Sequence, residues 1–121
     1  MRETTNISFY LKVNRIHVFV ETLKGIGSPK YICFLIDGEG KHLMLRTYNK
    51  KDFHSHRISD EVYSGRKSVD VSSKKLCDVL ANLYNWDKQN SYRIPGYIIN
   101  EEKAAIFYLE KAEVIYREKA T

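Results

Sequence analysis

The chain has 121 residues, of which 43% are hydrophobic and 29% charged, and a formal net charge of +5 at pH 7. This length fits a single domain over residues 1–121 with its own core, and the composition excludes an intrinsically disordered segment. No apolar run reaches the ~20 residues that span a bilayer, and the polar start Met1–Asn6 is unlike a signal peptide. We therefore expect a cytoplasmic protein without membrane contact, whose basic balance permits an acidic or nucleic-acid partner.

The first half begins with a segment in which apolar and polar residues alternate. This period of two over Ile7–Val13 is typical of a half-buried strand. Asn14 then suits an N-cap, and apolar residues recur at helical spacing as far as Ile26, which predicts a helix over 14–26. The β-branched residues of this run also fit a strand, but a strand would place Phe19 on the polar face. We therefore favour the helix.

Two further runs predict a β-hairpin in the middle of the chain. Tyr31–Ile36 is continuously apolar, His42–Tyr48 alternates, and the glycine-rich segment 37–41 between them has the composition of a turn. The turn matches no phosphate-binding pattern. Phe53–Ile58 is a weaker candidate strand, and the polar segment 59–67 is interpreted as a connector.

The second half is predicted to start with a strand over Ser68–Val71, after which Ser72 or Ser73 caps a second helix. The apolar stripe expected on this helix consists of Leu76, Val79, Leu80, Leu83 and Trp86. Tyr92–Ile99 is predicted to be a strand, which the Pro95-Gly96 pair must kink or place at a sheet edge.

The C-terminal segment allows two interpretations. Residues 100–103 have the composition of a turn, which predicts a strand over Ala104–Leu109 and a short helix from Glu110. Alternatively, Asn100 caps one long helix, because apolar residues further on are also spaced helically. We favour the strand, since Ile106-Phe107-Tyr108 would place bulky residues around too much of a helix surface.

In this interpretation the chain contains two similar halves, 7–58 and 68–109, joined by the connector 59–67. The first half has the order βαβββ, and the second has βαββ followed by a short terminal helix. The predicted fold class is α+β, with an antiparallel sheet backed by two helices and pseudo-two-fold symmetry.

The tandem strand–helix–strands order resembles a single domain of the DNA sliding clamps. The residues that carry this likeness are Ile7–Val13 leading into 14–26, and Ser68–Val71 leading into 73–86. The likeness is one of element order and not of sequence motifs. It implies that basic residues of the helices, such as Lys74 and Lys75, face DNA, and that a single such domain encircles DNA only by self-association. The chain resembles the TATA-box-binding protein less, because the trailing strands differ.

The sequence contains no recognised catalytic constellation and predicts no cofactor. The densest set of potential metal ligands is Asp52, His54, His56, Asp60 and Glu61. A His-x-His pair on a strand places both imidazoles on one side, so a metal-dependent hydrolase built on His54 and His56 is kept as a minor alternative. Cys33 and Cys77 lie inside apolar runs, which indicates reduced thiols and no disulfide-linked partner.

Several basic residues lie near tyrosines, and such pairs can stack on bases and neutralise phosphates. The predicted basic patch consists of Arg46, Lys50, Lys51, Arg57, Arg66 and Lys67. The leading hypothesis is a small non-enzymatic protein that binds nucleic acid or a DNA-associated protein complex. The alternative is an interaction module that dimerises, or recruits a partner, through a sheet edge.

Overall fold

The computed structural model describes residues 3–115 and has an α+β fold, as the sequence predicts. The strands are β1 (Glu3–Tyr10), β2 (Arg15–Phe19), β3 (Tyr31–Ile36), β4 (His42–Tyr48), β5 (His56–Arg57), β6 (Ser68–Ser72), β7 (Ser91–Ile99), β8 (Ala104–Tyr108) and β9 (Glu113–Ile115). The α-helices are α1 (Val20–Gly25) and α2 (Lys74–Tyr84). Short 3-10 turns are η1 (Leu11–Val13), η2 (Asp60–Tyr63), η3 (Asn100–Glu102) and η4 (Leu109–Lys111).

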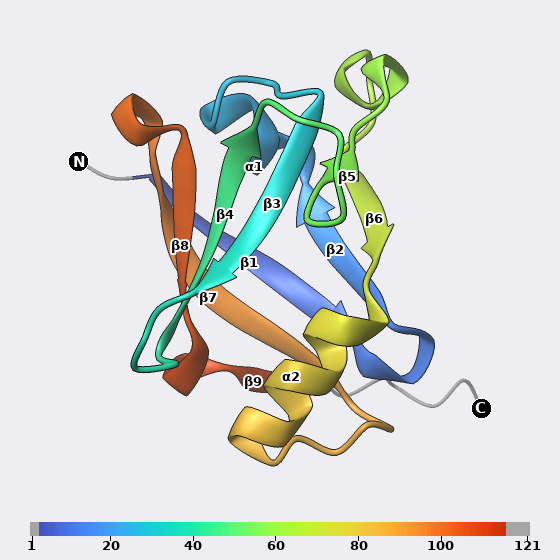
Figure 1. The fold of residues 1–121 in the computed structure, drawn as a ribbon, viewed down its shortest axis with the longest axis vertical. Coiled ribbons are helices and arrows are strands. Elements are labelled where there is room, and N and C mark those ends of the chain that lie inside the picture. The colour runs from blue at the N-terminus through green and yellow to red at the C-terminus, as the bar shows by residue number, and fades with distance from the viewer. Residues whose placement is uncertain (1–2, 116–121) are drawn as a thin grey trace.

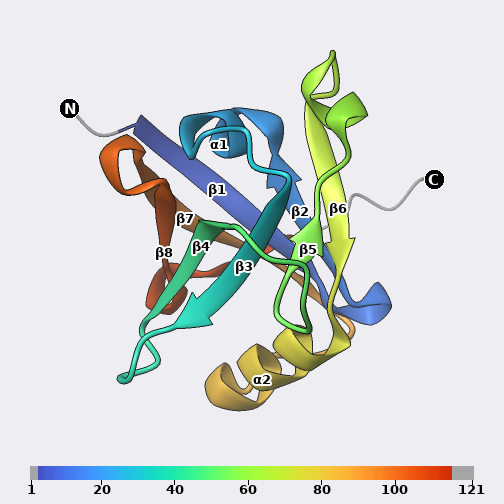
Figure 2. The same ribbon diagram turned by 45° about the horizontal axis from the view of Figure 1, so that its top comes forward.

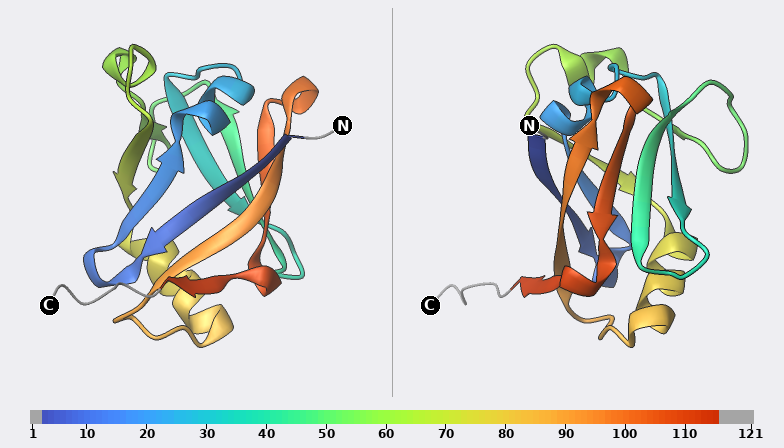
Figure 3. Two further views of the ribbon diagram at one scale, coloured as in Figure 1. Left: turned by 180° about the vertical axis from the view of Figure 1, so that it is seen from behind. Right: turned by 90° about the vertical axis from the view of Figure 1, so that its left-hand side faces the viewer.

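The strands form one antiparallel sheet in the order β5-β3-β4-β8-β7-β1-β2-β6, with β9 added beside β7. The sheet curls so strongly that β3 and β4 cross in front of β1 and β7 (Figure 1). The last strands of the path, β5 and β6, consequently come side by side in Figures 1 and 2, although they are not paired. Helix α2 lies across one end of the curled sheet and α1 lies at the other. The two views of Figure 3 show the same layers from behind and from the side.

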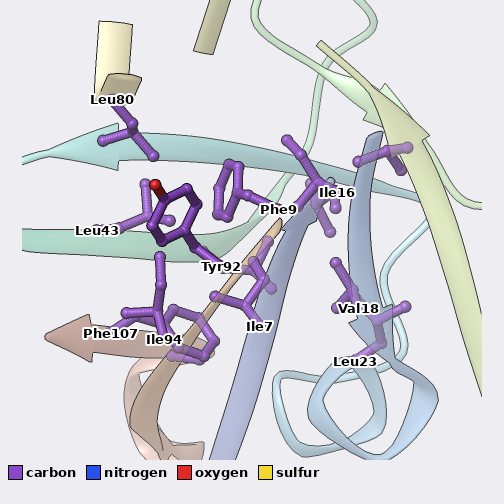
Figure 4. Packing of buried hydrophobic residues seen from close by; sticks show 14 of the residues in the cluster. Ile7, Phe9, Ile16, Val18, Leu23, Leu43, Leu80, Tyr92, Ile94 and Phe107 are labelled. Atoms are coloured by element: carbon purple, nitrogen blue, oxygen red, sulfur yellow. The ribbon is translucent and has the colours of Figure 1, made fainter. Parts of the chain in front are cut away.

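The core lies between the two facing parts of the sheet. Ile7 and Phe9 of β1 and Phe107 of β8 are fully buried there (Figure 4). Leu80 of α2 points toward Leu43 and Tyr92 and extends the core to the helix. The alternation seen in the sequence therefore reports the inward face of a curled sheet.

The helix predicted over 14–26 is wrong for most of its length, since β2 occupies Arg15–Phe19 and α1 only the six residues that follow. Asn14 adopts the left-handed conformation (φ 54°) between η1 and β2, a role in which asparagine is tolerated. Ile16 and Val18 are fully buried between β1 and β6. Phe19, the residue that weighed against a strand, remains 40% exposed. Burial of the β-branched residues outweighs the exposure of one aromatic ring.

The hairpin β3–β4 and its turn are confirmed. The Asp37 carboxylate accepts hydrogen bonds from the backbone N–H groups of Lys41 (2.8 Å) and His42 (3.1 Å), and it bonds Nδ1 of the His42 ring at 2.7 Å. The bond from the His42 side chain lowers the pKa of Asp37 to about 2. These bonds close segment 37–41 as a hairpin turn.

The strand predicted over Phe53–Ile58 is mostly absent. Only His56–Arg57 pair with β3, and the preceding residues form a loop, 49–55, that bulges beyond β3 and β4 (Figure 3, right). The segment 59–67 connects β5 to β6 as predicted, and it contains η2.

Helix α2 begins at the predicted cap, where the Ser73 hydroxyl accepts the N–H of Leu76. Its predicted apolar stripe is partly wrong, because Val79 and Leu83 are 42% and 51% exposed. The buried residues of the helix are Cys77, Leu80 and Ala81. The helix therefore rests on the end of the sheet along a face rotated from the predicted one and leaves apolar side chains uncovered.

Strand β7 is neither at an edge nor interrupted by Pro95. It pairs with β1 on one side, while on the other side β8 ends opposite Gly96 and β9 begins opposite Arg93. The proline, which has no N–H to donate, lies where β7 changes partner. Gly96 is required by close approach, since a Cβ there would lie 2.1 Å from the Ile106 carbonyl oxygen.

The strand predicted over Ala104–Leu109 is confirmed as β8, which excludes the long-helix alternative. The short helix predicted from Glu110 is wrong where the structure describes it, because η4 leads into β9, and its remainder lies outside the described residues. The repeat is not confirmed either. The first half runs strand–strand–helix and the second strand–helix–strand, so the two halves differ in element order.

Both cysteines are buried and free, as predicted. Within the described part of the chain, neither helix has the length and apolar character needed to cross a membrane.

Candidate functional site

The sheet has an opening on one side of β3. Strand β4 pairs with β3 along its whole length, but β5 pairs only with Tyr31 and Ile32. Residues 33–36 therefore have no neighbouring strand on the β5 side within the described residues. This opening lies between β3, loop 49–55 and α2.

The alternation of an antiparallel ladder determines which backbone groups face the opening. The N–H of Asp37 bonds the carbonyl of His42, so Leu35 and Cys33 direct their backbone groups toward β4. The N–H and C=O groups of Phe34 and Ile36 then point the other way. No backbone hydrogen bond outside the ladders, within residues 3–115, involves either residue. Four hydrogen-bonding groups therefore face the opening.

The opening holds a groove of about 630 Å³. We call it the seam groove, and its lining residues are Phe34, Leu35, Ile36, Phe53, His54, His56, Ser73, Lys75, Leu76 and Val79. The edge of β3 forms one wall and the first turns of α2 form the other, with loop 49–55 at the side. Most of this lining is apolar.

Loop 49–55 is held in shape by the carboxylate of Asp52. The Tyr48 hydroxyl donates to Asp52 Oδ2 at 2.7 Å, and Oδ1 accepts the backbone N–H of His54 at 2.8 Å. The bond from Tyr48 lowers the pKa of Asp52, and the same bond raises the pKa of Tyr48. The carboxylate is thereby occupied within the loop. The folded loop presents Phe53 at its tip with the entire side chain exposed.

Apolar side chains around the groove are unusually exposed. Phe53 is 104% exposed relative to the reference state, Leu35 of β3 is 47% exposed and Val79 of α2 is 42% exposed. Single exposed apolar residues are common on protein surfaces, whereas large contiguous apolar patches are rare on monomeric proteins.

The groove lining includes the basic side chain of Lys75 and contains no aspartate or glutamate. Lys74 and Lys88 both bind Asp78, which leaves Lys75 without an ion-pair partner among the described residues. The His56 ring packs edge-on against Phe34, with a centroid distance of 5.5 Å. Burial lowers the pKa of His56, so its imidazole is neutral at pH 7.

A second cavity of about 550 Å³ adjoins the seam groove and shares Phe34, Leu35 and His54 with it. Arg46, Glu102 and Lys103 contribute charges of both signs to its lining. Cys33 also lines this cavity, but burial raises the pKa of its thiol. A thiol of raised pKa is a poor nucleophile at neutral pH.

The predicted basic residues are distributed over β4, loop 49–55, β5, segment 59–67 and α2. Lys75 lines the seam groove, Arg46 lines the adjoining cavity, and Lys50 and Lys51 begin loop 49–55. Lys74 is exposed on α2 but bound to Asp78, and Arg57 is exposed on β5. Arg66 and Lys67 precede β6 at its far end from α2, at the top of Figure 1. The structure therefore does not gather all eight into one patch.

The predicted metal ligands are dispersed. His54 and His56 both line the seam groove, but His54 lies in the loop and not on a strand. Asp60 and Glu61 lie in η2. Among residues 3–115, no three histidine, cysteine, aspartate or glutamate side chains are grouped as a metal site requires.

Comparisons of the chain with protein-family models, with curated proteins and with solved structures find no match. The resemblance to sliding-clamp domains therefore stays a prediction.

Proposed function

We propose that this protein is a binding module that recognises a partner protein at the seam groove. The observation that carries the proposal is the complete exposure of Phe53 beside the half-exposed Leu35 and Val79. Aromatic side chains, phenylalanine among them, are enriched in protein–protein interfaces relative to the rest of the surface. Contact with a partner would remove this apolar area from water.

The aliphatic walls of the groove favour a protein over a nucleic acid. Leu35, Leu76 and Val79 offer no hydrogen bonds and only a weak stacking surface for bases. They match the apolar side chains of a protein partner instead. The proposed role is non-catalytic, since the neutral Cys33 thiol and the occupied Asp52 carboxylate support no nucleophile or general base.

The proposal is tested by panning a display library of protein fragments against the wild-type protein and against Val79→Asp. Fragments that the wild type enriches are purified, and their binding is measured by calorimetry. We expect Val79→Asp and Phe53→Ala each to weaken binding at least tenfold, about 1.4 kcal/mol, because both remove apolar contact area.

Val13→Asp is the matched control, since Val13 is 60% exposed and does not line the groove. It must retain wild-type affinity, and all three variants must retain the wild-type circular dichroism spectrum. Fragments that bind Val79→Asp and Phe53→Ala as tightly as the wild type would contradict recognition at the seam groove.

A second candidate function is nucleic-acid binding on the outer side of β3 and β4. Lys50 and Lys51 precede the exposed Phe53 in loop 49–55, and Arg46 lines the adjoining cavity together with His54 of the same loop. Cations and an aromatic ring in one surface region suit single-stranded nucleic acid. Gel shift with single- and double-stranded DNA at low and moderate salt measures it. Binding that weakens with salt and is lost in Lys50→Glu/Lys51→Glu would favour this function. Absence of binding at low salt would remove it.

A further inference from the structure

We infer that the partner segment is an extended, acidic peptide that adds to the free edge of β3 as a further strand, in the space between β3 and α2. This inference rests on the proposed function and specifies its partner. It combines three features of the seam groove: the unpaired edge, the exposed apolar side chains on both sides of it, and the sign of the charges around it.

The edge supplies the backbone groups that strand addition needs. The N–H and C=O groups of Phe34 and Ile36 face the groove, and they continue the line along which Ile32 pairs with His56 of β5. Strand β5 ends its pairing there because the preceding residues leave the sheet as loop 49–55. An extended segment in this place would pair with these groups, which make no backbone hydrogen bond outside the ladders within residues 3–115.

The side chains of such a strand would alternate between two apolar surfaces. The inward face of β3 continues, through Phe34 and Ile36, toward Leu76 and Val79 of α2. The outward face carries Leu35, with Phe53 at the side. Successive residues of an added strand point to opposite faces. The segment should therefore carry apolar side chains at consecutive positions and lack proline at those that donate to β3.

The charges favour an acidic segment. The groove lining contains the cation Lys75 and no carboxylate. Lys50 and Lys51 lie in the adjoining loop beside one carboxylate, that of Asp52, which accepts hydrogen bonds from the Tyr48 hydroxyl and the His54 N–H. A second copy of this chain, paired edge to edge through β3, would bring these cations close to their counterparts, and like charges oppose such pairing. A peptide with aspartate or glutamate beside its apolar centre has the complementary charge.

The experiment uses two display libraries of short peptides with a random centre, one flanked by aspartate and glutamate and the other by lysine and arginine. Both are panned against the wild-type protein and against Val79→Asp. We expect enrichment from the acidic library alone, and only with the wild type. The most enriched peptide is then synthesised with single N-methyl groups at successive positions, and the amide exchange of the protein is followed by nuclear magnetic resonance.

Strand addition predicts a pattern with a period of two. N-methylation should weaken binding at least tenfold at alternate positions, because only those N–H groups donate to β3. Bound peptide should slow the exchange of the Phe34 and Ile36 amides more than that of Cys33 and Leu35. Lys75→Glu should weaken binding of the acidic peptide, whereas the control Val13→Asp should retain the wild-type affinity.

The outcomes separate this inference from the proposed function. Peptides that require Val79 but tolerate N-methylation at every position, or leave Phe34 and Ile36 unprotected, would overturn strand addition and leave recognition at the groove standing. Enrichment from the basic library would overturn the acidic partner. If neither library yields an enriched peptide, this inference is overturned. The proposed function is contradicted only if protein fragments also bind Val79→Asp as tightly as the wild type. If the wild type forms stable dimers that Val79→Asp does not form, the occupant of the β3 edge is a second copy of the chain. If DNA displaces the peptide, the occupant is a nucleic acid.

Discussion

Strands β7 and β3 belong to the same sheet, but their edges differ. Strand β7 pairs with β1 on one side and with β8 and then β9 on the other, so its backbone is enclosed by partners. Strand β3 pairs fully with β4 but has β5 beside only two of its residues. Thus β7 has paired strands on both sides, whereas part of β3 has a paired strand on one side only and borders an apolar groove on the other.

The difference separates what holds the fold together from what is available for binding. The inward side chains of β7, Tyr92, Ile94 and Ile98, are buried, so their substitution should affect the free energy of unfolding. Leu35 and Phe53 at the β3 opening are exposed, and their substitution should affect binding with little effect on unfolding. Substitutions in the enclosed and the exposed regions test this division.

The largest effect is expected from Gly96→Ala in β7. The added Cβ would lie 2.1 Å from the Ile106 carbonyl oxygen and 2.6 Å from the Phe107 ring, and a backbone contact of this kind cannot be relieved by a rotamer change. We expect the free energy of unfolding to fall by about 4 kcal/mol or more, measured by urea denaturation. Gly38→Ala is the control, because no atom lies within 4 Å of its added Cβ, and it should change stability by less than about 0.5 kcal/mol. Similar losses in both variants would refute the close approach at Gly96.

A smaller loss is expected from Leu80→Ala in α2. Leu80 is fully buried against the sheet, so its truncation should cost about 3 kcal/mol through lost burial and a residual cavity. Leu83→Ala, one turn further along and 51% exposed, should cost less than about 1 kcal/mol. Thermal and urea unfolding of both variants measure the contrast. Equal losses would mean that the helix packs along the face predicted from the sequence.

The smallest effect concerns pH and His56. Burial lowers the pKa of His56 in the folded protein, so the unfolded chain binds the proton first as the pH falls below about 6.5. The free energy of unfolding should therefore decrease between pH 7 and 5, and His56→Gln should flatten this dependence. The control is Phe53→Ala, in the exposed loop beside it, which removes no titratable group and should keep the wild-type slope. An unchanged slope in His56→Gln would contradict the burial of a neutral imidazole.

The sequence predicted those elements in which local chemistry and packing agree. The hairpin β3–β4 follows from an apolar run, a glycine-rich turn and an alternating run, and α2 follows from the Ser73 cap. Residues 14–26 were mispredicted because helical spacing and β-branched composition coincide there, and only the pairing with β1 and β6 decides for the strand. The place of Pro95 inside the sheet depends on where β8 ends and β9 begins, which no local pattern reports.

The sequence points to the seam groove less clearly than to the elements of the fold. The sequence directed attention to basic residues, and of these Lys75 lines the seam groove while Arg46 lines the adjoining cavity. Leu35 and Val79 look like core residues in the sequence, because their exposure depends on how β3 and α2 turn in the folded molecule. Phe53 gave the one local signal, an aromatic residue within a polar segment, but that signal is equally compatible with a strand.

Amide hydrogen exchange along β3 in the unliganded protein tests the open edge most directly. The structure predicts alternation: the amides of Cys33 and Leu35, bonded to β4, exchange slowly, whereas those of Phe34 and Ile36 exchange faster. Along β7, the amides of Tyr97 and Ile98, between β1 and β8, should both be slow. Uniform protection over residues 33–36 would mean that another part of the chain already pairs with this edge, and the account of an open β3 would be wrong.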